Sequence, residues 1–488
     1  MLFNSITFAI FMPIVFALYW FVFQRNLKVQ NFFVIVASYV FYGWWDWRFL
    51  LLIVFTSFCS WYCGLFMQHV DNQQNTNKRP FYLSRKFLNV SNIVLNLGIL
   101  GVFKYYNFFI ESFVSAFASV GIHLQSHTLN IILPVGISFY TFQALSYSID
   151  VYKRKIEPTK DMLAFFAFIG FFPLLVAGPI ERATNLLPQF YVKRTFTYEK
   201  AVDGMRQILW GLFKKIVIAD NCATYVNMVF NNYSDQTGSA LLLGAVFFAF
   251  QIYGDFSGYS DIAIGTARLF GISAMRNFNF PYFSRDIAEF WRRWHISLTT
   301  WFRDYVYIPL GGSRVSKAKV VRNTFIIFLV SGFWHGANWT FIIWGAFHAL
   351  LFLPLILLGK NRKNTDTVAE GKLFPNLREV YQMILTFFLV LIGWVFFRAD
   401  SIGQAFEYFS GMCQFDTFLA FYQMFTMKEG WLILVMLAVE WIGRKNQFGL
   451  EKLGTSWKPI YRHAMYYFII LLICLFTGKE QVFIYFQF

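Results

Sequence analysis

Three histidines, His295, His335 and His348, lie in one section of the chain among apolar residues. Ionisable side chains are costly inside a membrane and mark functional sites there by default. His335 lies in VSGFWHGANWTFIIWG, where Gly332 and Gly336 permit a helix break or close backbone contact. A buried, neutral imidazole suits a general base toward a hydroxyl, because desolvation disfavours its charged form. The pattern fits a hydrogen-bonded core histidine equally well.

His295 lies in the segment SRDIAEFWRRWHISLTTWFRDYVY, which is rich in aromatic and basic residues. At about 100° per residue its aromatic side chains gather on one arc, with His295 at the edge and Arg292 and Arg303 beyond it. This predicts one amphipathic helix near 286–305 that lies in the membrane interface. A crossing helix would carry its arginines through hydrocarbon at about 2.5–3.5 kcal/mol each. On spacing alone, the segment is an interfacial anchor and His295 packs at its boundary.

A third polar cluster, QIYGDFSGYSDIAIG, places Asp255 and Asp261 next to apolar sequence. Its glycines and serines form a small-residue surface suited to close helix contact. The two acids could serve an ion pathway or a substrate site, but we favour structural pairing with an arginine. His348 follows His335 by thirteen residues, which is more than three turns and roughly 20 Å on one continuous helix. We therefore expect His348 to be a packing residue.

The amino-acid composition indicates the kind of fold that must position these histidines and acids. Hydrophobic residues make up 57% of the 488 residues and charged residues 14%, against about 45–50% and about 25% in soluble proteins. The net charge of +16 comes largely from basic residues in short loops, which is typical of a membrane protein rather than a nucleic-acid-binding one. We predict an all-α polytopic membrane protein with roughly 11–13 embedded helices, some of them short or re-entrant.

Two stretches, His69–Lys86 and Gly359–Arg378, are polar and read as loops outside the membrane. Neither is long enough to be a domain, so we expect one integral-membrane domain over 1–488. The sequence contains no Walker loop, G-x-S-x-G, H-E-x-x-H or cysteine cluster. These absences argue against a nucleotide hydrolase, a serine hydrolase and a metalloenzyme, and we expect no metal.

Several long blocks stand out along the chain: MLFNS at the start, FFPLLVAGPIER (171–182), DFSGYSDIAIG (255–265), FWRRWHISLTTWFRDYVYIPLGG (290–312) and FWHGANWTFIIWG (333–345). These blocks resemble the membrane-bound O-acyltransferase (MBOAT) family, in its bacterial branch of alginate O-acetyltransferases. They follow the family order, which is more specific than any single motif. The motif-bearing core covers about 130–350, and the C-terminal helices at 380–488 resemble the family mainly in being apolar.

The resemblance implies transfer of an acetyl group from acetyl-CoA across the membrane toward a hydroxyl of a cell-envelope polysaccharide. His335 matches the histidine of the family's W-H-G motif, which is taken as catalytic, and His295 matches the second family histidine. His335 would take the hydroxyl proton, and His295 would polarise the thioester carbonyl. Basic residues on the cytosolic side would meet the coenzyme A phosphates. The candidate substrate-binding residues are Trp334, Asn338, Arg303, Asp304 and Asp255.

Two other functions stay open. A transporter or flippase without covalent chemistry would use the same buried acids and histidines as relay groups. A family member could also acylate a protein, a lipid or a teichoic acid. For the preferred function we expect an envelope polysaccharide, a possible extracytoplasmic acetyl-transfer partner protein and membrane lipids as partners, but no nucleic acid. The expected location is the bacterial cytoplasmic (inner) membrane, with multiple passes.

The 40 residues that separate His295 from His335 place the two on different helices. Between them, the apolar run 325–333 would rise about 14 Å as a helix, which is half a bilayer. We therefore predict that this half-span carries the chain from an interface to mid-membrane. The two histidines would flank a thin part of the protein, less than about 15 Å apart.

Overall fold

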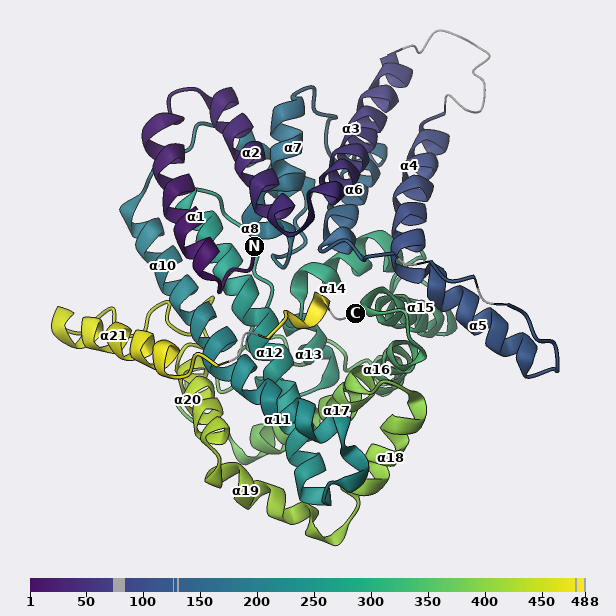
Figure 1. The fold of residues 1–488 in the computed structure, drawn as a ribbon, viewed down its shortest axis with the longest axis vertical. Helices are drawn as coiled ribbons and strands as arrows, with labels where there is room; N and C mark the ends of the chain where they lie inside the picture. Colours follow the sequence, from purple (N-terminus) through teal and green to yellow (C-terminus); the bar gives the residue numbers. More distant parts are fainter. Residues whose placement is uncertain (73–83, 126, 130, 479–480, 487–488) are drawn as a thin grey trace. The chain divides into compact units, whose positions relative to one another are not determined.

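The computed structural model describes residues 1–488 except 73–83, 126, 130, 479–480 and 487–488. Within these residues every secondary-structure element is a helix (Figure 1), which confirms the predicted all-α fold. The chain divides into two compact units, residues 1–201 with 266–275, and residues 202–265 with 276–488. The prediction of one integral-membrane domain over 1–488 stays a prediction.

The first unit contains the N-terminal helices. The polar stretch His69–Lys86 lies largely outside the described residues, between the end of α3 and the start of α4. The helices of the first unit are α1 (Ile6–Ala17), α2 (Leu27–Asp46), α3 (Leu50–Asn72), α4 (Arg85–Leu100), α5 (Tyr106–Ala118), α6 (Ile137–Tyr152), α7 (Met162–Gly170), α8 (Phe172–Leu175), α9 (Ala183–Leu186) and the start of α10 (Tyr198–Leu212).

The second unit contains most of α10 and the candidate site. It holds the π-helix η6 (Phe213–Ala219), α11 (Asp220–Asn231), most of α12 (Gly238–Leu269), α13 (Ile287–Arg293), α14 (Ile296–Phe302), the π-helix η9 (Arg303–Tyr307), α15 (Lys317–His335) and α16 (Trp339–Leu357). It continues with α17 (Leu377–Arg398), α18 (Ile402–Met412), α19 (Ala420–Thr426), α20 (Lys428–Ile442), α21 (Pro459–Leu475) and the short turn η11 (Ile484–Phe486).

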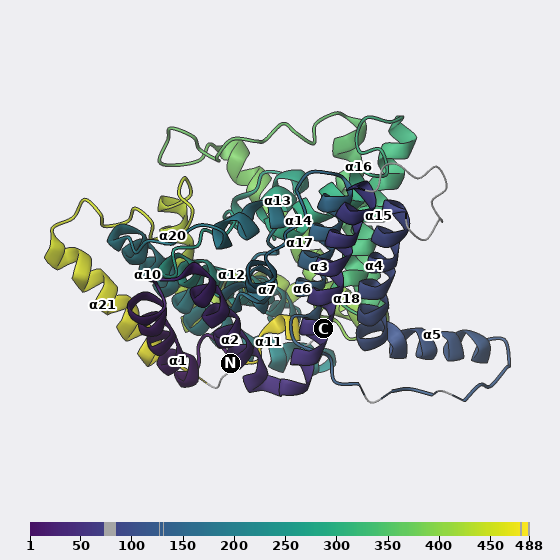
Figure 2. The ribbon, with the colours of Figure 1, turned by 90° about the horizontal axis from the view of Figure 1, so that it is seen from above.

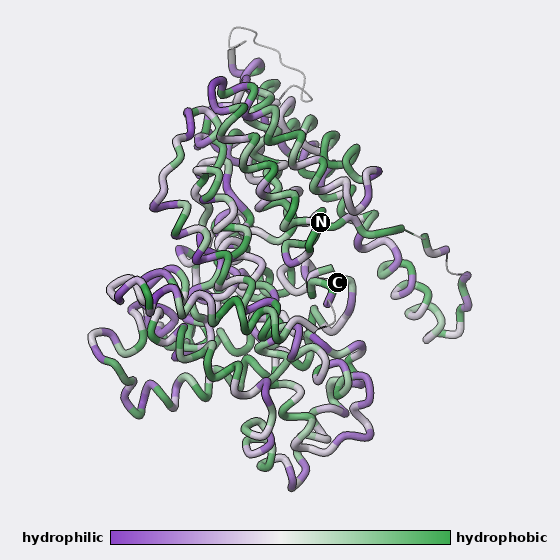
Figure 3. Tube along the Cα trace, turned by 60° about the vertical axis from the view of Figure 1, so that its left-hand side comes forward, coloured by the Kyte–Doolittle hydropathy of each residue, from purple (hydrophilic) through white to green (hydrophobic). Residues whose placement is uncertain are grey.

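Five helical stretches in the described residues are long and apolar enough to cross a membrane. Two shorter apolar helices, Ile6–Val22 and Pro459–Leu475, accompany them. Figure 3 shows hydrophobic residues along much of the helical trace, with hydrophilic residues concentrated in connections. The chain is thus a multi-pass membrane protein. The number of 11–13 embedded helices stays a prediction, because the length of a short helix does not show how deeply it enters the membrane. The stretches are 27–71, 85–118, 238–269, 339–357 and 377–398.

α15 and α16 form an antiparallel hairpin (Figure 2). The predicted break at His335 is confirmed: α15 ends there, Gly336 is extended, and Asn338 caps α16 through Thr340 N–H at 3.0 Å. The predicted half-span is wrong, because α15 begins at Lys317 and has 19 residues. At 1.5 Å per residue this is about 28 Å, close to a full hydrocarbon core.

The prediction of one amphipathic helix near 286–305 is also wrong. α13 ends at Arg293, and α14 begins after His295, which has left-handed backbone angles of φ 42° and ψ 55°. Burial is not confined to one arc either, since Arg293 is only 6% exposed. The break arises from the segment 277–279, whose backbone bonds both sides of it: Asn279 N–H donates to Arg293 O and Ile296 N–H to Asn277 O. Such nonlocal contacts leave no trace in local periodicity.

Candidate active site

α12 carries the two acids that the sequence singled out, and each is paired with a lysine of η6. Lys215 Nζ lies 2.7 Å from Asp255 and 2.8 Å from Asp220. Lys214 Nζ lies 2.7 Å from Asp261. The favoured structural pairing is therefore present, with lysines in place of the expected arginine. Because an unpaired buried charge is costly, these pairs fix α12 against η6.

Two glycines let these backbones come close, as the predicted small-residue surface requires. A Cβ atom at Gly254 would lie 2.9 Å from the carbonyl oxygen of Lys214. A Cβ atom at Gly258 would lie 2.8 Å from the carbonyl oxygen of Gly211. Both contacts are with backbone, which cannot easily move away. Glycine at these positions therefore brings the acids of α12 within reach of the lysines.

The same charge pair holds the C-terminal segment of the chain. Asp255 accepts a hydrogen bond from Ile484 N–H at 2.6 Å, and Lys215 donates to Gln481 O at 3.2 Å. These bonds place Tyr485 in the histidine cluster, with its ring 6.3 Å from the His295 ring and 5.6 Å from the His335 ring. Asp255 thus holds the segment that carries Tyr485 in place. Its contact with substrate stays a prediction.

His295 is buried at the break between α13 and α14. Its ring lies edge-on to Phe256, with centroids 4.6 Å apart, and its Nδ1 lies 3.0 Å from Asn277 Oδ1. Burial lowers the pKa of His295 to about 3, so the imidazole is neutral at physiological pH. A non-glycine residue in the left-handed region costs about 1–3 kcal/mol and is a reason to suspect function.

His335 is the last residue of α15 and is buried among aromatic rings. Its ring lies 5.1 Å from Trp344, 5.4 Å from Phe397 and 4.9 Å from Trp334, centroid to centroid. The hairpin brings α16 against it because Gly332 and Gly345 have no side chain at the crossing. A Cβ atom at Gly332 would lie 2.2 Å from Phe341 O.

The two histidines lie close together although 40 residues separate them. The ring of Trp334 lies 6.1 Å from that of His295 and 4.9 Å from that of His335, so the imidazole centroids are at most about 11 Å apart. This is within the predicted limit. His348 also lies near, because the Trp344 ring is 5.1 Å from both His335 and His348. The expected separation of roughly 20 Å assumed one continuous helix, which the break rules out.

The other predicted substrate-binding residues are in three settings. Trp334 is buried between the histidines. Asn338 caps α16 and donates to Asp400 O at 3.0 Å, so its side chain is engaged at the turn. Arg303 and Asp304 pair with each other at 2.8 Å on the surface. Substrate binding by these residues stays a prediction, and Trp334 is the one that the structure places beside both histidines.

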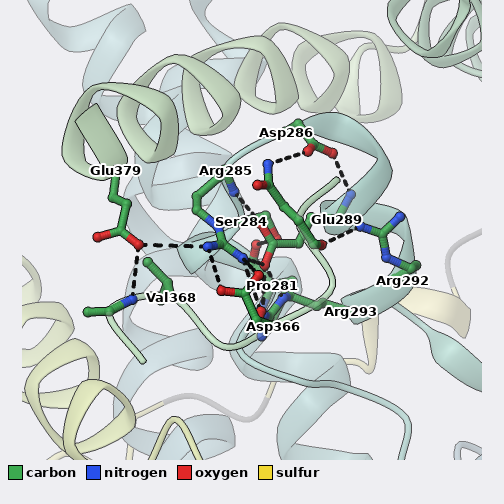
Figure 4. Close-up of polar contacts among 12 residues, drawn as sticks. Pro281, Ser284, Arg285, Asp286, Glu289, Arg292, Arg293, Asp366, Val368 and Glu379 are labelled. Carbon is green, nitrogen blue, oxygen red and sulfur yellow. Dashed lines mark hydrogen bonds and ion pairs between the residues drawn. The ribbon is translucent and has the colours of Figure 1, made fainter. Parts of the chain in front are cut away.

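A charged cluster on α13 fastens the polar loop that follows α16 (Figure 4). Glu289 is 1% exposed and accepts hydrogen bonds from Arg285 and Arg293. Arg285 also pairs with Asp366 of the loop at 3.0 Å, and its hydrogen bond lowers the pKa of that carboxyl. The predicted loop over Gly359–Arg378 is thus confirmed as largely non-helical, but it is fixed to the helices rather than freely solvated.

Sequence reasoning missed Asn277 and Tyr485. Asn277 belongs to a connection with no motif, and its role depends on the backbone of residues 293–297, which it meets only after folding. Tyr485 had a weak signal, because four of the last six residues, FIYFQF, are aromatic. In the described residues no group of three or more His, Cys, Asp and Glu side chains is placed to hold a metal ion.

The structure therefore defines an α-helical membrane protein with a buried histidine pair between helix ends. The profile of the MBOAT, membrane-bound O-acyltransferase, family matches residues 39–397. The chain belongs to this family and is an acyltransferase, as the sequence blocks predicted. Acyltransferases take their acyl group from a donor, so this protein requires an acyl donor. The protein is located in the bacterial inner membrane.

Curated relatives match over most of their length. The probable alginate O-acetylase AlgI of Pseudomonas aeruginosa is 39% identical over 462 residues, which is 93% of this chain and 84% of the relative. The protein of the same name in Pseudomonas putida is 35% identical over 512 residues and the match covers both chains fully. The peptidoglycan O-acetyltransferase of Helicobacter pylori is 34% identical over 441 residues, 84% of this chain and 80% of the relative.

Proposed function

We propose that this protein transfers an acetyl group from acetyl-CoA to a hydroxyl of a cell-envelope polysaccharide. The family supplies the reaction class, and the relatives named as O-acetylases of alginate and peptidoglycan support acetyl as the group and a glycan as acceptor. The observation that carries the proposal is the meeting of His295 and His335 around Trp334 and Tyr485.

The histidine pair suits transfer from a thioester to a hydroxyl. One imidazole takes the proton from the attacking hydroxyl, which is worth about 10²–10⁴ in rate. The other forms a hydrogen bond to the thioester carbonyl as negative charge develops on its oxygen. The family resemblance predicts the first role for His335 and the second for His295. The aromatic surroundings exclude water, which would otherwise hydrolyse the donor.

A basic surface suits the phosphates of the donor. α15 begins, and the loop after α16 starts, at the same end of the hairpin, because the two helices are antiparallel. Exposed basic residues gather at this end and would attract phosphate groups from the cytosol. They are Arg314, Lys317, Lys319, Arg322, Lys360, Arg362 and Lys363.

The acceptor belongs to the opposite side of the membrane. Alginate, peptidoglycan, cellulose or another glycan would present the required hydroxyl, either directly or through an extracytoplasmic partner protein. Trp334 is placed to contact either substrate, and Asn338, Arg303, Asp304 and Asp255 complete the proposed binding set.

Release of free thiol from acetyl-CoA by the purified protein tests this function. We expect thiol release that depends on a soluble glycan acceptor, with stoichiometric ester formation on the glycan. A transporter or flippase would release no thiol under any acceptor condition. Thiol release with a protein, lipid or teichoic acid but with no glycan would instead place the enzyme elsewhere in the family.

A further inference from the structure

Asn277 is fully buried and bonds His295 and the two residues that follow it at the break. Its Oδ1 lies 3.0 Å from His295 Nδ1, and it accepts hydrogen bonds from Ser297 Oγ at 2.9 Å and Ser297 N–H at 3.4 Å. Its Nδ2 donates to Ser260 Oγ at 3.0 Å. Its backbone carbonyl accepts from Ile296 N–H at 2.8 Å.

These contacts favour one tautomer of His295, because Ser297 Oγ, which lies 3.4 Å from His295 Nδ1, gives its hydrogen to Asn277 Oδ1 instead. A backbone N–H is always a donor, so the atom of Asn277 that faces Ser297 N–H is the amide oxygen. That oxygen can only accept, and therefore the His295 Nδ1 beside it carries the hydrogen. Burial keeps the imidazole neutral, with its pKa lowered to about 3. In a neutral imidazole with Nδ1–H, the other nitrogen, Nε2, carries a lone pair.

We propose that Asn277 is a positioning residue that holds His295 in the Nδ1–H tautomer, which makes His295 Nε2 the acceptor of the hydroxyl proton. This inference rests on the proposed acyl transfer and changes one assignment within it. A nitrogen with a lone pair cannot donate a hydrogen bond to the thioester carbonyl. The hydrogen bond to the carbonyl then falls to His335.

The resulting step balances without a further reactant. The hydroxyl O–H bond breaks and its proton moves to His295 Nε2, while the oxygen electron pair forms the bond to the thioester carbonyl carbon. The tetrahedral intermediate then collapses, and the C–S bond breaks with its electron pair on sulfur. The imidazolium returns the proton to that sulfur, which leaves as the thiol, and His295 is neutral again.

The left-handed backbone of His295 supports the same reading. The conformation is costly for a histidine, and the flanking backbone bonds to Asn277 and Asn279 hold it in place. Without the break, His295 would continue a helix and its Nδ1 would leave Asn277. The left-handed backbone therefore directs the ring so that Nδ1 lies against Asn277.

Substitutions at Asn277 test the positioning role through kinetic constants. Asn277→Leu removes the acceptor, and we expect kcat to fall at least about tenfold with the KM for acetyl-CoA changed less than about threefold. Asn277→Asp keeps an oxygen acceptor and should recover most of that loss. Asn96→Leu is the matched control, because Asn96 is equally buried but donates to Asn92 O within α4, and it should change kcat per folded protein less than about threefold. An unchanged kcat in Asn277→Leu, or no recovery in Asn277→Asp, would overturn the inference.

Glutamine at position 295 separates the two roles. Its amide can donate a hydrogen bond but cannot take a proton at neutral pH. We expect His295→Gln to be as inactive as His295→Ala, whereas a carbonyl-binding role would leave the glutamine variant much more active than the alanine variant. Nitrogen-15 chemical shifts of histidine-labelled protein, assigned with His295→Gln, read the tautomer without any activity. A hydrogen on Nε2 would overturn the inference, while absent thiol release by the unaltered protein would reject only the proposed function.

Discussion

His335 and His348 are both buried and both lie 5.1 Å from the ring of Trp344, yet their backbones differ. His335 ends α15 at a break, whereas His348 lies inside α16. There His348 Nδ1 accepts a hydrogen bond from Trp291 Nε1 at 3.3 Å. This bond holds α13 against α16, so we assign His348 to packing, as its sequence setting predicted.

We predict that His335→Ala lowers the rate of acetyl transfer by about 10²–10⁴ while the protein stays folded and inserted, since it removes either a base or a carbonyl hydrogen bond. His348→Gln is the matched control, because an amide oxygen can still accept from Trp291. We expect it to retain activity within about threefold. Thiol release per folded protein measures both, and full activity in a folded His335→Ala protein would remove His335 from the chemistry.

The α15–α16 hairpin is the element that positions His335, and it depends on glycine at the crossing. We predict that Gly332→Ala destabilises the protein by about 1–3 kcal/mol, because the new Cβ would meet Phe341 O at 2.2 Å. The rate should fall as well, since His335 lies one turn further along α15. Gly98→Ala in α4 is the control, because apart from its chain neighbours and the backbone of its own helix no described atom lies within 4 Å of its new Cβ. Thermal unfolding measures both, and equal stability of the two variants would contradict the close crossing.

The Arg285–Glu289 ion pair helps to hold the loop after α16 in place. We predict that Arg285→Gln costs about 1–3 kcal/mol, because the side chains of Arg285 and Glu289 are 6% and 2% exposed and the buried carboxylate would lose one of its two arginine partners. Asp366→Asn should cost no more than about 1 kcal/mol, because the Asp366 side chain is 48% exposed and water screens the pair. Chemical denaturation compares the two, and similar losses would show that the burial of Glu289 does not matter.

Local signals predicted some elements well. Gly336 and Asn338 punctuate the apolar sequence after His335, so the break there was predictable from neighbouring residues. The break at His295 was not, because its cause is hydrogen bonding to Asn277 and Asn279, which local periodicity does not register. The apolar run 325–333 predicted too short a helix, because residues 317–324, which include three basic side chains, form the first two turns of α15.

The two histidines of the site were predictable from the sequence, but the residues that hold them in place were not. Family blocks marked His295 and His335, and apolar context marked Asp255. Lys215 lies 40 residues from Asp255 and Lys214 lies 47 residues from Asp261, so neither pair shares a local pattern. The contact of Asp255 with Ile484 joins residues more than 200 apart. A single sequence carries no such pairing, so Tyr485 could not be placed beside the histidines.

At the scale of the whole molecule, charge is distributed unevenly along the hairpin of the second unit. The basic residues at the start of α15 and after α16 lie at one end. At the other end, the turn 336–338 contains no charged residue. Asn338 of this turn donates a hydrogen bond to the backbone carbonyl of Asp400. Basic connections favour the cytoplasmic side of a membrane. We therefore expect the break at His335 to lie toward the extracytoplasmic end.

We predict opposite accessibility of the two ends. In a variant without the native cysteines, Lys363→Cys should react with a membrane-impermeant thiol reagent only in inside-out vesicles. Asp400→Cys should react only in intact spheroplasts, because its side chain is 81% exposed at the other end. Labelling of both positions from one side would overturn the assigned orientation.

The central claim is that a donor from the basic end and a hydroxyl from the opposite end meet at the histidine pair. Proteoliposomes oriented with the basic end outward test it directly, with acetyl-labelled coenzyme A outside and a soluble glycan acceptor sealed inside. The account predicts labelled ester on the enclosed glycan, free thiol outside, no coenzyme A in the lumen, and loss of all label transfer in His335→Ala. Label confined to the outer compartment, or coenzyme A that crosses the membrane intact, would contradict it.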